Sequence, residues 1–312
     1  MNINWLENSI IFECISGSHA YGLNTPESDT DYRGICIPPE DYFLGMYSFD
    51  QHEQKDPDRT IFNIKKFVNL AIENNPNILE FMFMPEDCII KTTEIWKQFV
   101  KNRDLFLSKK VKFTYAGYAY AQLKRVKSHK AWLLNPPDHK PERQEFGIID
   151  TSLSKADYGM LESLETKEQL NTLPSKEIIS LYLKEKNYRN ALKHYNQYQE
   201  WVKNRNVKRA ELEKKFGYDT KHMGHVFRLL LQGEHILKEN TLPVRLNDED
   251  RKYILDIKAG KYQYDELLAA ADKRMQDFET LYSSSTLQHS PDVARINQVL
   301  RNTLHTYFID KA

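Results

Sequence analysis

The stretch SGSHAYGLNTPESDTDYRG, residues 16–34, decides the fold. An apolar run at 10–15 precedes it and a second run at 32–37 overlaps its end, which predicts two short strands joined by a turning loop. Gly17 lets the backbone approach a ligand closely, and the hydroxyl of Ser18 with the neighbouring N–H groups can cradle a triphosphate. The stretch therefore predicts an anion-binding turn at the end of the first strand.

Two aspartates open the second of these strands. Residues i and i+2 of a strand face the same way, so we expect Asp29 and Asp31 to present two carboxylates on one face. Hard anionic oxygen donors at this spacing suit Mg²⁺ or Mn²⁺ held jointly with phosphate oxygens. Aspartate is also common in turns, so a bare Asp-x-Asp has a polar turn as its alternative interpretation. The Gly-Ser turn before the pair favours the metal site.

The order of apolar strand, Gly-Ser, loop and Asp-x-Asp strand resembles the signature of the DNA polymerase β nucleotidyltransferase superfamily. The similarity continues in IKKFVNLAIENNPNILEFMF at 64–83, KFGYDTKHMGHVFRLL at 215–230 and LPVRL at 242–246. With these segments the chain resembles the RlaP-like family of predicted nucleotidyltransferases, which is named for its occurrence in RNA-repair operons and has relatives in large phages. The resemblance implies an α+β fold with a small mixed sheet and helices, followed by a mainly helical domain.

The resemblance also implies roles for individual residues. Gly17 and Ser18 match the nucleotide-binding turn of the superfamily. Asp29 and Asp31 match its metal-binding pair. In the superfamily a third carboxylate comes from a later strand, where it binds metal or deprotonates the attacking hydroxyl.

Two acids of this chain compete for that third role. Glu80 lies in the apolar run 78–84, which predicts a fourth strand, and an acid there is costly unless it is paired or on a metal. We expect Glu80 to be the catalytic and metal-binding third carboxylate. Asp58, at the entrance to an expected strand at 60–64, is its rival. The alternative for Glu80 is a salt bridge to an Arg or Lys of the helical part of the chain.

Other candidate nucleotide-binding residues flank this core. Arg33 can bind phosphate as a bidentate donor or neutralise Asp29. A helix that starts near Asp219 places cationic side chains on one face, where they can meet a triphosphate or an RNA phosphate. Alternatively, Asp219 is an N-cap and the histidines of that helix pack internally. The expected nucleotide-binding set is Gly17, Ser18, His19, Tyr21, Arg33, Lys221 and His222.

The chain changes character after its first hundred residues. A third strand at 60–64 continues into a helix that Asn74-Asn75-Pro76 should end. Later segments have helical periodicity, with few glycines. The expected helices cover 92–106, 109–134, 175–203, 219–239 and 262–284. The weakly patterned stretch 135–174 is expected to be a long functional loop. We therefore expect a catalytic domain at 1–100 and a helical substrate-binding and closing domain at 101–312.

The composition narrows the class of protein. The chain has 312 residues, of which 40% are hydrophobic and 12% aromatic, and this excludes a disordered or collagenous protein. Its opening residues lack the pattern of a secretory signal, and no stretch is long and apolar enough for a membrane span, so we expect a cytoplasmic protein. The 3 cysteines lack C-x-x-C spacing and are expected to be buried thiols.

The net charge of zero hides an asymmetry. Residues 1–100 carry 7 Lys and Arg against 16 Asp and Glu, whereas 101–130 carries 9 against 1. This basic segment interleaves cations with Phe113 and three tyrosines, a combination suited to single-stranded RNA or a tRNA end. The alternative is a helix whose aromatic residues pack while its lysines reach solvent. We expect most of the tyrosines to pack and some of the cations to bind anions.

Together these expectations define one reaction. A nucleoside monophosphate passes from an NTP to an acceptor hydroxyl, with an RNA or tRNA 3′ end as the leading acceptor, and pyrophosphate is released. Two Mg²⁺ or Mn²⁺ ions are the expected cofactors. The alternatives are nucleotidylation of a protein side chain, as in toxin–antitoxin systems, and an NTP-binding sensor without efficient catalysis. The sequence leaves the base of the NTP and the oligomeric state open.

Overall fold

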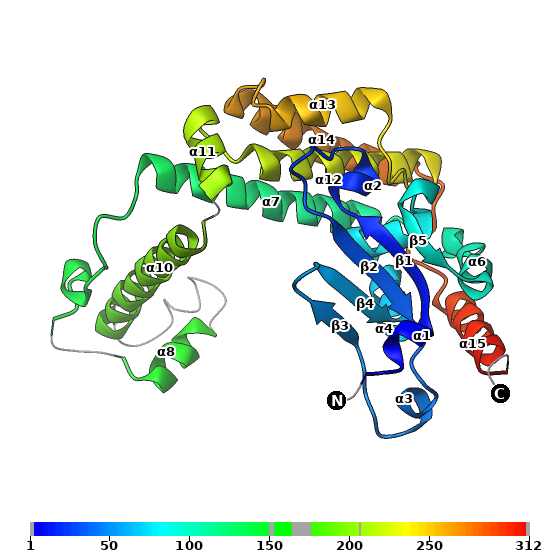
Figure 1. Cartoon of the computed structure of the whole chain (residues 1–312). Helices are drawn as coiled ribbons and strands as arrows, with labels where there is room; N and C mark the ends of the chain where they lie inside the picture. Colours follow the sequence, from blue (N-terminus) through cyan, green and yellow to red (C-terminus); the bar gives the residue numbers. More distant parts are fainter. Residues whose placement is uncertain (1–2, 150–152, 164–175, 206, 310–312) are drawn as a thin grey trace. The chain divides into compact units, whose positions relative to one another are not determined.

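The computed structural model describes residues 3–149, 153–163, 176–205 and 207–309 (Figure 1). Its contacts divide the chain into two compact units. Unit 1 combines Met1–Val126 with Thr220–Ala312, and unit 2 is Lys127–Asp219. Unit 1 is therefore built from two segments, one from each end of the sequence. The division of catalytic and substrate-binding roles at residue 100 stays a prediction.

Unit 1 contains one mixed sheet of five strands, in the order β3-β4-β2-β1-β5. The strands are β1 (Ile10–Ser16), β2 (Asp31–Cys36), β3 (Gln51–Gln54), β4 (Arg59–Asn63) and β5 (Ile89–Thr92). β2 and β4 pair in parallel, and the other neighbours pair antiparallel. This small mixed sheet, followed by a largely helical region, confirms the expected fold class.

The two central strands form because their apolar side chains are buried. Phe12 and Cys14 of β1 and Ile35 and Cys36 of β2 are all 0% exposed. Burial raises the pKa of the Cys36 thiol to about 12. All three cysteines are free and buried, as predicted.

Helices surround this sheet in unit 1. They are α1 (Leu6–Ser9), α2 (Ser18–Tyr21), α3 (Asp41–Leu44), α4 (Ile64–Ile72), α5 (Pro76–Leu79), α6 (Glu94–Val100), α12 (Thr220–Glu239), α13 (Asp248–Lys258), α14 (Tyr264–Ser284) and α15 (Val293–Ile309). Short 3₁₀ turns lie at Glu80–Phe83, Glu86–Cys88 and Arg103–Phe106. α15 contacts α4 and α6, and α12 contacts α13 and α14. α7 (Val111–Leu134) begins in unit 1 and continues into unit 2.

The expected strand at 78–84 is wrong. The side chain of Asn75 caps α5 by accepting a hydrogen bond from the backbone of Asn77, and Pro76 occupies the first turn, where a missing N–H costs nothing. The apolar residues that follow continue as a 3₁₀ turn. Phe81 of this turn stacks on Phe67 of α4, with ring centroids 6.1 Å apart. A short buried helix and a short buried strand have the same apolar pattern, and here the cap decides between them.

Unit 2 holds α8 (Lys155–Glu162), α10 (Lys176–Asn204) and α11 (Val207–Phe216), with a 3₁₀ turn at Arg143–Phe146. The expectation of a long loop at 135–174 is therefore wrong where this turn and α8 form. The part of that expectation at 150–152 and 164–175 lies outside the described residues. Tyr158 and Leu161 of α8 pack with Tyr182 of α10 in a small core.

The aromatic residues of the basic helix α7 differ in burial. Tyr115 is fully buried, whereas Tyr118 and Tyr120 are 39% and 59% exposed. Phe113 is 61% exposed. The expectation that most of these tyrosines pack is thus wrong, because two of the three project from the helix surface. Among the helices that the structure describes, none combines the length and apolarity needed to cross a bilayer.

Candidate active site

The turn after β1 brings its backbone against an aspartate. Gly17 has φ 68° and ψ −140°, a conformation that residues with a side chain rarely adopt. A Cβ atom on Gly17 would lie 2.5 Å from Oδ2 of Asp31, so a larger residue would displace this carboxylate. Glycine is therefore favoured here by the backbone conformation and by the position of Asp31.

Asp31 and Asp58 lie side by side at the end of the sheet where β2 and β4 begin. The parallel register pairs Tyr32 with Arg59, so the residues just before them are neighbours on adjacent strands. The backbone N–H of Tyr32 donates to the carbonyl oxygen of Asp58 at 2.8 Å. Ser16, the last residue of β1, is opposite Asp31 on its other side. Three strand ends therefore meet at this carboxylate pair.

Arg33 connects the two carboxylates. Its Nη1 donates to Oδ1 of Asp58 at 3.0 Å, and its Nη2 lies 3.9 Å from Oδ1 of Asp31. Burial, together with a hydrogen bond to Asp58 and its charge, raises the pKa of Asp31, although the charge of Arg33 opposes this. The hydrogen bond from Arg33 lowers the pKa of Asp58. Arg33 thus pairs with Asp58 and Asp31, rather than with Asp29 as one alternative held.

Asp29 stands apart from this pair. Its side chain is exposed, and β2 begins only at Asp31, so the expected strand at Asp29 does not extend that far. Among the described residues, Asp29, Asp31 and Asp58 do not form a group whose donor atoms all lie within 4.8 Å of one another. The structure brings together Asp31 and Asp58, with Asp29 in the loop two residues before Asp31.

Two lysines lie on the side of the site formed by α12 and α13. Lys221, an exposed residue of the first turn of α12, is near enough for its charge to lower the pKa of Asp31. Lys258 of α13 is half-buried and donates from Nζ to the carbonyl oxygen of Leu23 at 2.7 Å. Burial and the charge of Lys221 lower the pKa of Lys258. Two cations held this close to each other favour an anion between them.

The segment after α12 holds the turn 17–22 in place. Arg245 donates to the carbonyl oxygens of His19 and Ala20, at 3.3 and 3.4 Å. The backbone N–H of Leu246 donates to the carbonyl oxygen of Tyr21 at 3.4 Å. Both residues belong to the LPVRL segment of the sequence. This segment therefore clamps the turn by hydrogen bonds to its backbone carbonyl oxygens.

Glu80 lies in a buried network beneath the turn. It is 2% exposed, and Nη1 of Arg228 donates to its Oε1 at 2.6 Å. The hydroxyl of Tyr21 donates to its Oε2 at 2.7 Å, and the guanidinium of Arg228 lies 4.2 Å from the ring centroid of Tyr21. Burial raises the pKa of Glu80, while Arg228 and Tyr21 oppose the rise. The salt bridge held open as an alternative for Glu80 is therefore present, with an arginine of α12.

The remaining expected residues differ in their placement. Ser18 begins α2 directly after Gly17, and its carbonyl oxygen accepts hydrogen bonds from Gly22 and Leu23. The hydroxyl of Tyr21 donates to Glu80 in the buried network, and burial raises the pKa of Tyr21, with smaller contributions from the charges of Glu80 and Asp31. His222 lies beside His225 on α12, with ring centroids 6.4 Å apart. Their roles in nucleotide binding stay predictions.

The carboxylate pair suits a hard divalent cation. Two adjacent carboxylates, one with a pKa raised by burial and by the charge of the other, are stabilised by a positive charge between them. Their donors are oxygens only, the set that Mg²⁺ and Mn²⁺ prefer. The side chains that could hold the ion are those of Asp31 and Asp58, with Asp29 nearby in sequence.

Comparison with known proteins finds a family similar to the first part of the chain. The family described as "RlaP: RNA repair pathway DNA polymerase beta family" matches residues 3–134. This range includes the whole sheet, the Gly17 turn and the carboxylate pair. In this part the chain is similar to a family of the DNA polymerase β class, and nucleotidyl transfer is implied at the level of that family.

A phage protein extends the similarity along most of the chain. It is described as "Uncharacterized 38.9 kDa protein in nrdC-mobD intergenic region" of Enterobacteria phage T4. The two sequences are 24% identical over 323 aligned residues, which cover 89% of this chain and 92% of the phage protein. No solved structure matches the chain.

Sequence reasoning missed two residues of this site and ranked a third too low. Lys258 and Arg245 lie far from the Gly-Ser turn in sequence, and only the fold brings them to it. The LPVRL segment carried a signal for Arg245 because it was part of the family resemblance. Asp58 precedes a strand directly, and pairing of that strand with β2 would have identified it.

Proposed function

We propose that the protein is a metal-dependent nucleotidyltransferase that transfers a nucleoside monophosphate from an NTP to an acceptor hydroxyl. The observation that carries the proposal is the contact of Gly17 with Asp31, beside Asp58, at the ends of three strands. A glycine turn and paired carboxylates in contact offer phosphate binding and cation binding at one place.

The residues of the chain have separate tasks in this reaction. The Gly17–Ser18 backbone and Arg33 orient the phosphates, while Lys221 and Lys258 offset the charge of the triphosphate. When bound, Mg²⁺ or Mn²⁺ ions at Asp29, Asp31 and Asp58 supply further charge neutralisation. The acceptor oxygen forms a bond to the α-phosphorus, the bond to the pyrophosphate oxygen breaks, and the acceptor proton is released.

Asp58 is the third carboxylate in this proposal. It lies beside Asp31, and both of its oxygens accept hydrogen bonds from Arg33, at 3.0 and 3.4 Å. Its side chain is exposed to solvent, so a cation and an acceptor can reach it. Both oxygens of Glu80 already accept hydrogen bonds, from Arg228 and Tyr21, and solvent does not reach them. We therefore assign to Asp58 the role first expected of Glu80.

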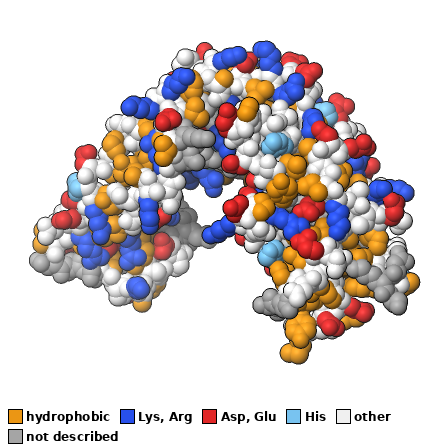
Figure 2. Space-filling model, in the orientation of Figure 1, with side chains coloured by type: hydrophobic (Ala, Val, Ile, Leu, Met, Phe, Trp, Pro, Cys, Tyr) orange, Lys and Arg blue, Asp and Glu red, His pale blue; other side chains and the backbone are white. Residues whose placement is uncertain are grey.

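An RNA 3′ end is the acceptor that the surface of unit 1 favours. Tyr120 of α7 is exposed, and Lys124 and Arg125 follow on the exposed surface one turn later. An aromatic ring can stack on an unpaired base while the cations neutralise phosphates. In Figure 2, basic side chains are interspersed with acidic ones rather than gathered together, in keeping with a net charge of zero. RNA binding of this kind would be local and weak at high salt.

Incorporation of label tests the proposal directly. The purified full chain is incubated with each α-³²P-labelled NTP, with Mg²⁺ or Mn²⁺ and with total RNA, and RNA and protein are resolved on separate denaturing gels. We expect label in RNA with one preferred NTP, and none with Asp31→Asn. Label on protein instead would identify a side chain as the acceptor. Bound NTP without transfer would support a sensor.

A matched variant separates loss of chemistry from loss of folding. His139→Ala changes an exposed residue of unit 2 that lies 3.1 Å from Glu145, whereas the proposed site belongs to unit 1. It should incorporate label as the wild type does. Wild-type incorporation by Asp31→Asn, measured beside this control, would contradict the assignment of the carboxylate pair.

A further inference from the structure

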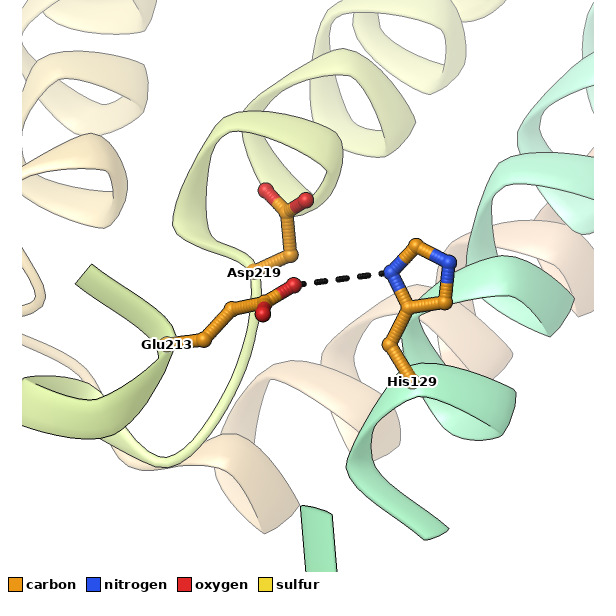
Figure 3. Close-up of side chains that lie close together, drawn as sticks. All are labelled: His129, Glu213 and Asp219. Carbon is orange, nitrogen blue, oxygen red and sulfur yellow. Dashed lines mark ion pairs between the residues drawn. The ribbon is translucent and has the colours of Figure 1, made fainter. Parts of the chain in front are cut away.

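Unit 2 contains a second group of metal-binding side chains, which the nucleotidyl transfer reaction does not use. His129 lies on α7, Glu213 on α11 and Asp219 in the connection between α11 and α12. One donor atom of each lies within 4.8 Å of the donors of the other two. Figure 3 shows the Glu213 carboxylate pointing toward the imidazole of His129. Three elements that are separate in sequence therefore converge on one point.

The two carboxylates of this group are buried. Glu213 is 2% exposed and Asp219 is 3% exposed, so water does not offset their charges. Nε of Arg205 donates to Oε2 of Glu213 at 3.0 Å, and its Nη2 contacts the same oxygen. Arg205 thus contacts one oxygen of Glu213, while the other oxygen, Oε1, faces His129. Buried carboxylates are costly unless each is paired with a cation or bound to a metal ion.

The separation of His129 and Glu213 fits two ligands of one ion. Nδ1 of His129 lies 3.5 Å from Oε1 of Glu213, longer than the 2.7–3.2 Å of an ordinary hydrogen bond. Two ligands of a tetrahedral ion with bonds of about 2.1 Å are about 3.4 Å apart. Arg205 occupies the other oxygen of Glu213, which orients Oε1 toward the imidazole.

A cavity borders this group at Glu213. Its volume is about 500 Å³, and Glu213 and Arg205 are among its lining residues, together with Lys130, Leu133, Leu134 and Gly217. His129 and Asp219 do not line it. A metal site needs an entry path, and this cavity offers one on the side of Glu213.

From these observations we propose that His129, Glu213 and Asp219 bind a divalent transition-metal ion such as Zn²⁺. One imidazole nitrogen and two carboxylate oxygens are a donor set suited to Zn²⁺ and its first-row neighbours. The ion joins α7, α11 and the connection that follows α11 through one centre. The proposal does not depend on nucleotidyl transfer, because none of the three residues belongs to the carboxylate pair in unit 1.

Zn²⁺ titration by calorimetry tests this site in the full chain. The background carries Asp29→Asn, Asp31→Asn and Asp58→Asn, so that the proposed site in unit 1 does not contribute. We expect one Zn²⁺ per chain and a melting temperature that rises with Zn²⁺. His129→Ala and Asp219→Asn should each weaken binding by at least about 100-fold, since changes to residues that only support ligands already cost 10–100-fold. His139→Ala, a histidine of the same unit that faces a single glutamate, should leave binding unchanged.

Co²⁺ gives a second measurement that does not depend on the stability of the variants. The ring of His129 lies 5.8 Å from that of Trp132 and 5.4 Å from that of Trp201. Co²⁺ at the site should quench part of the tryptophan fluorescence and show the visible absorption of a site with nitrogen and oxygen ligands. Zn²⁺ should reverse both effects. No Zn²⁺ bound by the background protein, or binding unchanged by His129→Ala and Asp219→Asn, would overturn the proposal and leave a buried ion cluster with His129 as a cation.

Discussion

Two acids of unit 1, Asp58 and Glu80, were candidates for the same role, and the structure places them in opposite surroundings. Asp58 is exposed just before β4, where its neighbours are Arg33 and the carboxylate of Asp31. Glu80 is buried, where its neighbours are a guanidinium and a phenol. The difference teaches that a buried acid with all its oxygens bonded stabilises a fold, whereas an exposed acid in a surface ion pair beside a like charge stays accessible to a ligand.

The largest effect should come from removing the charge of Glu80. Glu80→Ala leaves the guanidinium of Arg228 buried without its partner, and we expect the free energy of unfolding to fall by about 3–5 kcal/mol. Urea unfolding followed by circular dichroism measures this change. The double variant Glu80→Leu with Arg228→Met removes both charges and should be more stable than either single variant. A loss below about 1 kcal/mol for Glu80→Ala would contradict the structural role.

Replacing Asp58 should affect catalysis instead of stability. Asp58→Asn keeps the shape of the side chain, and we expect nucleotide incorporation to fall by about 10²–10³-fold because a charged group of the transition state is lost. The free energy of unfolding should change by no more than about 0.5 kcal/mol, since the side chain is exposed. Single-turnover incorporation assays and urea unfolding make the comparison. If Glu80→Gln abolishes incorporation and Asp58→Asn does not, the roles assigned to the two acids must be exchanged.

A smaller effect should follow from replacing Tyr21, the phenol that binds Glu80. Tyr21→Phe removes the hydrogen bond to Oε2 of Glu80, a bond to a charged group worth about 1.5–3 kcal/mol. The KM for the NTP should stay at its wild-type value, because the hydroxyl is buried and donates to Glu80 rather than to Asp31 or Asp58. Thermal unfolding and NTP titration measure the two quantities. A raised KM with unchanged stability would place the hydroxyl in the nucleotide site.

The smallest effect concerns the dependence of stability on pH in metal-free protein. The pKa of Asp31 is raised in the folded state by burial and by Asp58, so the folded chain binds this proton more tightly than the unfolded chain. The contribution of Asp31 to the free energy of unfolding is present below its ordinary pKa of 3.8. It is lost as the pH rises through the higher pKa that Asp31 has in the folded protein. Asp31→Asn should remove this loss.

Asp58 should show the opposite dependence, because Arg33 lowers its pKa. The stability that it contributes is present above 3.8 and is lost as the pH falls through its folded value. Urea unfolding in EDTA at a series of pH values distinguishes the two variants. Equal slopes for both would show that the two carboxylates do not interact in the folded protein.

The sequence predicted β1, β2 and the helix after β4 because their apolar residues recur at clear intervals. β3 was missed because its four residues, QHEQ, have no apolar alternation and pair with β4 alone. The expected strand at 78–84 failed because the apolar run was compatible with a helix, and the cap at Asn75 was not weighed. Short edge strands depend on a neighbour that local sequence does not contain.

The site was predictable only in its local part. Gly17 and Asp31 lie within one short stretch, and the spacing between them indicated their proximity. The partner of Glu80 is Arg228, which is 148 residues away along the chain. A sequence pattern shows that a buried acid needs a partner, and only the fold shows which residue supplies it. For that reason the sequence left the salt bridge of Glu80 as an alternative without naming its partner.

The distribution of unit 1 over both ends of the chain has a consequence for synthesis on the ribosome. The strands and Glu80 leave the ribosome first, and Arg228 follows 148 residues later. At about 5–20 residues per second, the nascent sheet waits roughly 7–30 s for the cation that neutralises its buried acid. During that interval the turn at Gly17 also lacks its clamp from Arg245. The nascent N-terminal half is thus an incomplete domain that should engage chaperones, and it becomes a finished site only when the last third of the protein has been translated.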